Sequence, residues 1–524
     1  MSSAPTKLLR SFATVGGWTM ASRVLGFVRD ILIAAFLGSG PIAEAFFVAF
    51  RLPNMFRRFF AEGAFNMAFI PMFAKRLEGD GPAAAHKFGT EALSALFAAL
   101  VVLTVLAQVA MPWFVYALAS GFEGDDRFDT AVLFSRIVFP YILFISLAAL
   151  FSGVLNAFGK FAAAAAAPVL LNVIFIAAIL AAHYMQWNVG LALVWAAAFA
   201  GIAQLALVWV AANRIGMGLT LKRPRLTPDV KRLITIGIPA ALAGGVMQIN
   251  LLVGTQVASY FDRAISWLSY ADRIYQLPLG VVGIAIGVVL LPELSRRFRA
   301  GDSTGTADAM NRATEFTMIL TIPAAVALVA IPGLIVSVLF ERGSFSATDT
   351  AATAQALAIY ALGLPSFVLQ KVLQPAYFAR EDTKTPLRFA LISMVINVVL
   401  AIGLAPVFGF LAAAIGTTVA GWAMVLLLWR GVRHLDPTLT ADARLRYRTP
   451  RILASAAMMG ATAYALATVL PAYLSSTMLT FLIVFLIAVV SYFTFAAVLG
   501  AFRPSDIKQA MRSQTARKSE DKTH

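Results

Sequence analysis

Long apolar stretches, separated by short charged or Pro/Gly-containing breaks, follow one another along the whole chain. A helix needs roughly 20 mostly apolar residues to cross a hydrocarbon core of about 30 Å. Fourteen stretches meet this condition, and they cover 12–37, 42–73, 90–117, 131–157, 161–182, 189–212, 233–258, 267–291, 314–340, 351–378, 387–408, 409–429, 452–471 and 476–500. The pattern predicts an all-α polytopic membrane protein with about fourteen transmembrane helices.

The composition supports a membrane protein and argues against an enzyme. Charged residues make up 13% of the 524 residues and hydrophobic residues 60%, whereas soluble proteins carry roughly 25% charged residues. The chain has no cysteine and only four histidines, which are far apart in the sequence. Thiolate metal sites and disulfides are therefore excluded, and we expect neither catalysis, nor a metal site, nor a cofactor.

The net charge of +16 reflects membrane topology. If the N-terminus is cytoplasmic, most of the 42 lysines and arginines fall in tails and cytoplasmic loops, and only Arg127, Arg263 and Arg342 lie on the outer side. The positive-inside rule then places both termini in the cytoplasm. We expect the basic tail 503–524 to lie near anionic headgroups, and we expect no nucleic-acid partner.

Short motifs recur about 220 residues apart, which indicates an internal duplication. Leu52-Pro53 matches Leu277-Pro278, and Phe139-Pro140 matches Leu364-Pro365. Chance resemblance among apolar helices is the alternative. A duplicated six-helix bundle predicts two pseudo-symmetric lobes with a site between them near mid-membrane. The predicted parts are an N-terminal lobe (1–220), a C-terminal lobe (221–435), an extra helix pair (436–502) and the cytoplasmic tail (503–524).

Charged residues lie inside the first predicted span. A charge at the centre of a membrane helix costs about 2.5–3.5 kcal/mol on insertion scales, so it needs a partner, water or a function. Arg23 lies near the midpoint of the span, with Arg29 and Asp30 further out. Arg23, Gly26 and Asp30 share one helix face, because they are three and seven residues apart.

The second and eighth spans are also charged. In the second span, Glu44, Arg51 and Arg58 recur every seven residues and therefore share one side, and Arg57 lies near its midpoint. The span is longer than a bilayer requires and contains Pro53, so we expect it to be bent or tilted beside a water-filled cavity. Further charges complete the set: Glu62 in the second span, and Asp272 and Arg273 in the outer half of the eighth.

Cations outnumber carboxylates in these spans. With Lys371 of the tenth span included, the cations exceed the acids Asp30, Glu44, Glu62 and Asp272 by three. Such a surplus favours an anionic ligand, and arginine's planar fork suits phosphate or pyrophosphate. The alternative is internal pairing, of Arg23 with Asp30 and of Glu44 with Arg51. An outer acidic cluster, Glu123, Asp125, Asp126 and Asp129, is interpreted as a solvated loop.

Three motifs resemble the MurJ (MviN) lipid II flippase family of the multidrug/oligosaccharidyl-lipid/polysaccharide exporter superfamily. They are Ser22-Arg23-Val-Leu-Gly26-Phe-Val-Arg29-Asp30, Ala45-Phe-Phe-Val-Ala-Phe-Arg51-Leu-Pro53-Asn54 with Phe60-Ala-Glu62-Gly63, and Tyr270-Ala-Asp272-Arg273. The resemblance runs nearly end to end. It implies two six-helix lobes around a cationic cavity, and a final helix pair that forms a groove for a polyprenyl tail.

By this resemblance the substrate-contacting arginines are Arg23, Arg29, Arg57 and Arg273, with Asp30, Glu44, Arg51, Arg58, Glu62 and Asp272 as supporting or gating charges. The implied substrate is lipid II in the bacterial inner membrane, and cell-wall synthesis proteins are further candidate partners. Two positions depart from the family pattern, since Glu44 stands where aspartate is expected and Gln276 where some members have an acid. The seventh, eleventh and twelfth spans lack Asp and Glu, so they offer no carboxylate for a sodium site.

These features lead us to expect alternating access, in which the arginines bind the pyrophosphate of lipid II and the membrane potential drives export. One alternative is a cation-coupled multidrug exporter of the same superfamily, which would favour buried carboxylates. The other is a non-transporting membrane scaffold, in which the arginines should all be paired.

Overall fold

The computed structural model describes residues 4–57 and 64–501. Side chains are described throughout these ranges except at 4–13, 64–67, 238–251, 281, 283–289 and 291–292. The described residues form helices joined by short turns, with no strand among them, which confirms the predicted all-α class.

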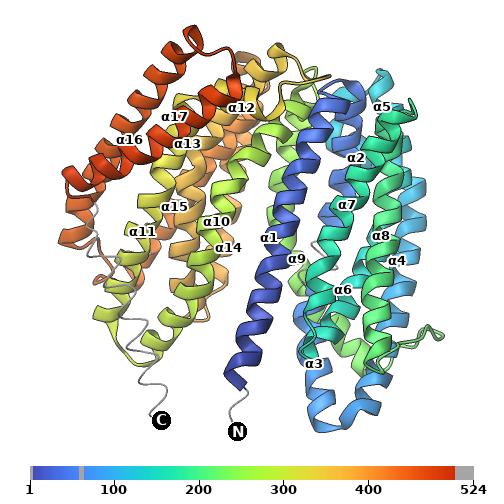
Figure 1. Cartoon of the computed structure of the whole chain (residues 1–524). Helices are drawn as coiled ribbons and strands as arrows, with labels where there is room; N and C mark the ends of the chain where they lie inside the picture. The colour runs from blue at the N-terminus through green and yellow to red at the C-terminus, as the bar shows by residue number, and fades with distance from the viewer. Residues whose placement is uncertain (1–3, 58–63, 502–524) are drawn as a thin grey trace. The chain divides into compact units, whose positions relative to one another are not determined.

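The helices in chain order, labelled in Figure 1, are α1 (Ala4–Leu37), α2 (Pro41–Arg57), α3 (Ala64–Gly79), α4 (Gly81–Ala119), η2 (Ser120–Phe122), α5 (Asp126–Val138), α6 (Tyr141–Ala157), α7 (Ala162–Tyr184), α8 (Val189–Arg214), α9 (Pro228–Ala258), α10 (Ala264–Arg299), α11 (Ser303–Ala330), α12 (Pro332–Phe340), α13 (Ala347–Phe378), α14 (Lys384–Phe408), α15 (Leu411–Leu435), α16 (Ala443–Val469), η3 (Leu470–Ala472) and α17 (Thr477–Val498).

The chain divides into two compact units. Unit 1 comprises Met1–Tyr270, Phe340–Asp349 and Ala405–Ala413, and unit 2 comprises Ala271–Leu339, Thr350–Leu404 and Ala414–His524. Within unit 1, α7 packs against α1 and α8, α2 against α5, and α9 against α3 and α4. Within unit 2, α16 packs along both α11 and α17. The two predicted lobes and their boundaries stay a prediction.

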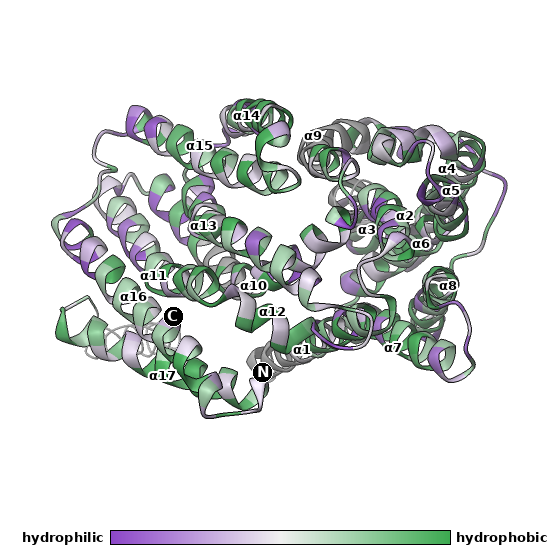
Figure 2. Ribbon diagram, turned by 90° about the horizontal axis from the view of Figure 1, so that it is seen from above, coloured by the Kyte–Doolittle hydropathy of each residue, from purple (hydrophilic) through white to green (hydrophobic). Residues whose placement is uncertain are grey.

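Ten helical segments of the described chain are long and apolar enough to cross a membrane. They correspond to ten of the fourteen predicted spans, and α14 and α17, which are little buried, consist mostly of hydrophobic residues (Figure 2). The other four predicted spans fall on α1, α2 with α3, α9 and α10. The protein is thus a multi-pass membrane protein, and a count of fourteen is consistent with the structure.

Proline positions explain where two predicted spans break. The span predicted at 131–157 consists of α5 and α6, which are separated by a turn at Phe139-Pro140. The span predicted at 314–340 consists of α11, which ends at Ala330, and α12, which starts at Pro332. Proline lacks an N–H donor, so Pro332 suits the first position of α12, and Pro140 stands at the N-cap of α6.

Candidate functional site

The arginines of α1 differ in their surroundings. Arg23 is exposed, and no ion pair of Arg23 forms with any described residue. Arg29 is half-buried and donates from Nε and Nη2 to Oδ1 of Asp30, at 3.1 and 2.8 Å. Asp30, which the alternative interpretation paired with Arg23, is therefore paired with Arg29 instead.

Asn172 of α7 orients Arg29, and the sequence interpretation missed it. Its Oδ1 accepts a hydrogen bond of 2.9 Å from Nη1 of Arg29, and its Nδ2 donates to the carbonyl of Ser22 at 2.9 Å. Asn172 is buried and lies beside Gly26, where a Cβ would meet its Nδ2 at 3.5 Å, an ordinary van der Waals distance. A lone amide within an apolar span is the signal that could have identified it.

The guanidinium of Arg29 also lies 5.7 Å from the centre of the Phe175 ring, one helical turn beyond Asn172. An acid, an amide and an aromatic ring therefore surround one cation. Such an arrangement fixes the direction of the guanidinium, which is what a preorganised anion-binding group requires.

Charges on α2 are described as far as Arg57. Arg51 is half-buried and donates from Nη2 to Oγ of Ser269, over 3.3 Å. Arg57, the last residue of α2, is half-buried. The predicted supporting residues Arg58 and Glu62 lie outside the described residues. Whether α2 and α3 form one overlong bent span therefore stays a prediction, although the helix does continue through Pro53.

The charged residues of α10 lie in unit 2. Arg273 is exposed and Asp272 is half-buried, and the side-chain amide of Gln276 donates to Oδ2 of Asp272. Gln276 thus supplies a neutral donor where some relatives were expected to carry an acid. Unit 1 contains Arg23, Arg29 and Arg57, so the structure describes Arg273 separately from them.

Glu44 belongs to a buried cluster at the predicted outer end of unit 1. Its Oε2 accepts from Nη1 of Arg127 at 3.0 Å, and both side chains are at most 9% exposed. Its Oε1 accepts from the backbone N–H of Ile265 at 3.2 Å, in the first turn of α10. The suggested Glu44–Arg51 pair is thus replaced by Glu44–Arg127, and Glu44 caps the start of α10 from another helix.

Arg127 and Asp125 complete this cluster. Arg127, which was predicted to lie on the outer side, is buried against the Phe122 ring, 4.6 Å from the ring centre. Asp125 is exposed, as expected for the acidic cluster interpreted as a solvated loop, and it is the N-cap of α5 and accepts from Nε of Arg127 at 2.5 Å. The backbone N–H of Arg127 also donates to Asp125, and this bond holds the pKa of its carboxyl below the usual value. No metal-binding group of acids occurs in the described part of the chain.

Asp349, at the start of α13, forms a second buried hub of unit 1. It accepts hydrogen bonds from Ser39 at 2.5 Å and from the Trp267 indole at 2.9 Å, and Nη1 of Arg263 lies 3.6 Å away. Nearby, Tyr270 donates to the carbonyl of Gly38 at 2.7 Å. The first turn of α10 is therefore held by two carboxylates, Glu44 and Asp349.

Glycines allow the backbone to close around this hub. The N–H of Ser344 donates to the carbonyl of Ala35 at 2.8 Å. Gly38 and Gly343, on either side of this contact, have φ of +70° and +58°, and a Cβ on Gly38 would lie 2.6 Å from the carbonyl oxygen of Ser344. Only glycine combines a positive φ with so close an approach.

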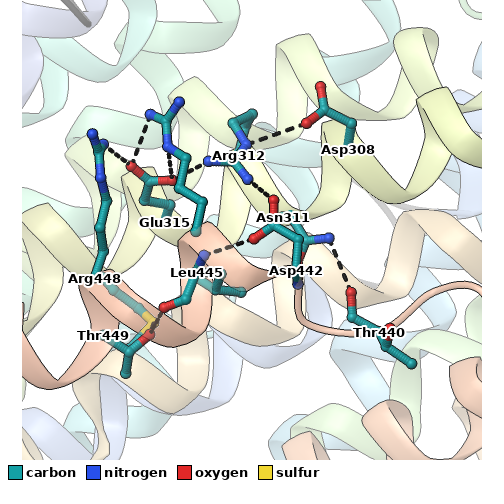
Figure 3. A network of polar contacts seen from close by, with 11 residues as sticks. Asp308, Asn311, Arg312, Glu315, Thr440, Asp442, Leu445, Arg448 and Thr449 are labelled. Carbon is teal, nitrogen blue, oxygen red and sulfur yellow. Dashed lines mark hydrogen bonds and ion pairs between the residues drawn. The ribbon is translucent and has the colours of Figure 1, made fainter.

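A third cluster, in unit 2, joins α11 to α16 and was not foreseen (Figure 3). Glu315 of α11 is 4% exposed, and its carboxylate contacts Arg312, Arg444 and Arg448. Asp442, the N-cap of α16, binds Arg312 as well. One buried carboxylate therefore binds three guanidinium groups at the predicted cytoplasmic end of the C-terminal helix pair.

Comparison with known proteins gives one consistent match. The family model described as "Lipid II flippase MurJ" matches residues 33–497. The "Probable lipid II flippase MurJ" of Rhizobium meliloti is 49% identical over 468 residues, covering 87% of this chain and 86% of that protein. The "Lipid II flippase MurJ" of Burkholderia cenocepacia is 36% identical, covering 86% of this chain and 89% of that protein.

Solved structures agree with this match. A structure described as "Lipid II flippase MurJ, inward closed conformation" superposes with a TM-score of 0.78 at 25% identity, covering 92% of this chain and 98% of that one. An inward-facing multidrug transporter of the MATE family has a TM-score of 0.68 at 14% identity, covering 80% of this chain and 96% of that one, which shows a shared fold.

Proposed function

Because the chain belongs to the lipid II flippase MurJ family, we propose that it moves lipid II from the cytoplasmic to the outer leaflet of the bacterial inner membrane. No covalent bond changes in such a step, so the protein acts as a transporter without catalysis or cofactor. The multidrug-exporter alternative is not favoured, since the matching family model and the relatives are lipid II flippases. Both termini are proposed to be cytoplasmic, as the positive-inside rule indicates.

The observation that carries the proposed binding mode is the surplus of cations in the charged spans. Glu44 was counted as a partner for these cations, but it is bound by Arg127 at the predicted outer end. Among the described charges of the spans, this leaves Asp30 and Asp272 beside the cations Arg23, Arg29, Arg51, Arg57, Arg273 and Lys371. The surplus is larger than the sequence count, and a pyrophosphate with about two negative charges would offset it.

Arg23, Arg29, Arg57 and Arg273 are the proposed pyrophosphate ligands. Arg29 is preorganised, because Asn172 and Asp30 fix its fork. Arg23 is exposed and engages no described acid, which leaves its five donors available. The proposed lobes, 1–220 and 221–435, would contribute from both sides of a cleft, and the pair 436–502 would accommodate the polyprenyl tail.

Alternating access would then move the bound headgroup outward. Moving one charge through 100 mV is worth about 2.3 kcal/mol, so a potential that is positive outside drives a dianionic headgroup in the export direction. Asp30, Glu44, Arg51, Arg58, Glu62 and Asp272 are proposed to support the arginines or to change partners during the cycle. Such a motion has to break the hydrogen bonds by which Glu44 and Asp349 bind the first turn of α10.

The test is complementation of a strain depleted of its own flippase. Arg23→Ala, Arg29→Ala, Arg57→Ala and Arg273→Ala should each abolish growth at normal protein levels, whereas the exposed Arg430→Ala should grow like the wild type. A flipping assay in vesicles with lipid II and a controlled potential provides the direct measurement. Normal growth of all four variants would refute the proposed binding mode.

A further inference from the structure

A long apolar groove runs through unit 2 between α11, α13, α15 and α16. It consists of two cavities of about 380 and 430 Å³. Both cavities are lined by Met318 and Leu369, so they continue into one another. On α11 the lining extends from Thr314 to Ala330, which corresponds to about 24 Å along the helix.

The groove is suited to hydrocarbon. Its walls are almost entirely aliphatic or aromatic, and it is open at the side, so in a membrane it meets lipid and not water. An apolar cavity that faces a bilayer fills with hydrocarbon, because leaving its walls without contacts forfeits dispersion energy. One extended acyl chain can occupy a slot of this length, which exceeds the hydrocarbon depth of one leaflet, about 15 Å.

The predicted cytoplasmic end of the groove is cationic. Arg446 lines this end, and Trp429 of α15 lies across from it. Arg433 is four residues beyond Trp429, so it lies on the same side of α15. Both arginines are exposed, and neither forms an ion pair with any described residue.

The Glu315 cluster explains why Arg446 is left for a ligand. Arg444 and Arg448 are four residues apart and both contact Glu315. Figure 3 shows the contact of Arg448. Arg446, midway between them, projects from the opposite side of α16 and lines the groove. The carboxylate of Glu315 is therefore engaged by other arginines. The positive charge of Arg446 has no described acid as a partner, and it lies where an acyl chain in the groove would reach the headgroup layer.

We propose that this groove is a binding site for one anionic phospholipid of the cytoplasmic leaflet. One acyl chain lies along α11 and α16, and the phosphate binds Arg446 and Arg433, with Trp429 at the level of the headgroup. Basic pockets between helices on the cytoplasmic side are suited to such headgroups. This site holds a resident lipid and is separate from the arginines of α1 and α2, so it does not depend on the proposed transport activity.

Native mass spectrometry of the full-length protein in detergent, titrated with phosphatidylglycerol or phosphatidylethanolamine of identical chains, tests the site. The wild type should retain phosphatidylglycerol more strongly. Arg446→Gln should weaken phosphatidylglycerol about fivefold and reduce the preference accordingly, since one basic residue near the membrane surface contributes about 1 kcal/mol. Arg430→Gln, which removes an equal charge away from the groove lining, should change neither lipid.

Two variants test the groove itself. Ala457→Phe and Leu453→Trp enlarge exposed side chains that line it, so each should displace the phospholipid at an unchanged melting temperature. Equal retention of the two lipids by the wild type would overturn the proposal. Phospholipid adducts that persist in both variants, with both variants well folded, would also overturn it. If the two variants lost only a polyprenyl pyrophosphate adduct and kept the phospholipid, the groove would be assigned to the substrate's tail, and the proposal would again be overturned.

Discussion

The guanidinium of Arg127 donates from Nη1 to Oε2 of Glu44 over 3.0 Å, although the two residues are 83 positions apart. Both side chains are nearly inaccessible, so the pair joins the start of α2 to the start of α5 away from water. Glu44 also accepts from Ile265, which extends the link to α10. This pair is therefore a structural joint that supports the charged helices.

Arg127→Ala should destabilise the protein strongly. Removing one partner of a buried ion pair costs about 3–5 kcal/mol, because the other charge is left buried. Adding Glu44→Gln should restore part of the melting temperature in detergent, since the neutral amide no longer needs the cation and can still accept from Ile265. If the losses in melting temperature caused by Arg127→Ala and by Glu44→Gln simply added up in the double variant, the two residues would be uncoupled.

Asp125 should make this joint sensitive to acid. The pKa of Asp125 is lowered in the folded protein by the N–H of Arg127 and by its guanidinium. A lowered folded pKa stabilises the fold above the unfolded value of about 3.9, and this contribution is lost as the pH falls through the folded pKa. The melting-temperature difference between wild type and Asp125→Asn should be constant near neutral pH and shrink below about pH 4. A difference that grows in acid would contradict this assignment.

Most of the fold was predictable because hydrocarbon imposes a simple rule. A span needs a long apolar run, and a charge within one is costly, so Arg23, Arg29 and Asp272 stand out in the sequence without any structural information. Proline breaks inside spans were harder to place. Proline is tolerated within membrane helices, as Pro53 in α2 demonstrates, so Pro140 and Pro332 alone do not reveal where a helix ends.

The partners of the charges were not predictable, since they depend on contacts between distant helices. Glu44 could be paired by sequence only with a neighbour such as Arg51, whereas its true partner lies on another helix. A clue did exist, because Arg127 is one of only three basic residues that the positive-inside rule left on the outer side. Asn172 offered a similar clue as a lone amide in an apolar helix. Exceptions to a composition rule are thus good candidates for buried polar contacts.

Asn172→Leu should impair transport more than stability. The variant keeps the number of side-chain heavy atoms but removes the acceptor for Arg29 and the donor to Ser22. A hydrogen bond to a charged group is worth about 1.5–3 kcal/mol, so lipid II flipping in vesicles should fall roughly tenfold or more. Gln204→Leu is the matched control, because Gln204 is a buried amide of the same unit that bonds to Tyr141 and Ala167. Equal transport losses in the two variants would indicate a general packing defect.

Gln276→Glu should weaken the fold around Asp272. The amide of Gln276 donates to Asp272 one helical turn away, and a carboxylate there would replace attraction by repulsion between like charges. We expect a loss of a few tenths of a kcal/mol from the pair itself, together with reduced flipping that recovers in acidic buffer as one carboxylate takes up a proton. Gln276→Leu removes the hydrogen bond without adding charge, so its activity should not depend on pH in this way. Identical pH profiles for the two variants would exclude charge repulsion as the cause.

Glu315 should be the strongest single anchor of the C-terminal helix pair. Its carboxylate is 4% exposed and contacts Arg312, Arg444 and Arg448, so Glu315→Ala leaves a concentration of positive charge between α11 and α16. Breaking a buried pair costs about 3–5 kcal/mol. The variant should therefore melt earlier, and proteases should cut more readily at residues 436–442, where the chain enters α16.

Asp308→Asn provides the comparison for that measurement. Asp308 contacts the same Arg312 at 3.4 Å, but its side chain is 65% exposed, and an exposed pair contributes about 0–1 kcal/mol. Its melting temperature and its proteolysis should therefore match the wild type. Combining Glu315→Met with Arg448→Met should recover part of the stability, because two apolar side chains of suitable length replace a charge that would otherwise stay buried and unpaired. If Asp308→Asn and Glu315→Ala had the same melting temperature, burial of the Glu315 carboxylate could not be the source of its contribution to stability. The junction of α11 with α16 would then depend on its apolar contacts alone.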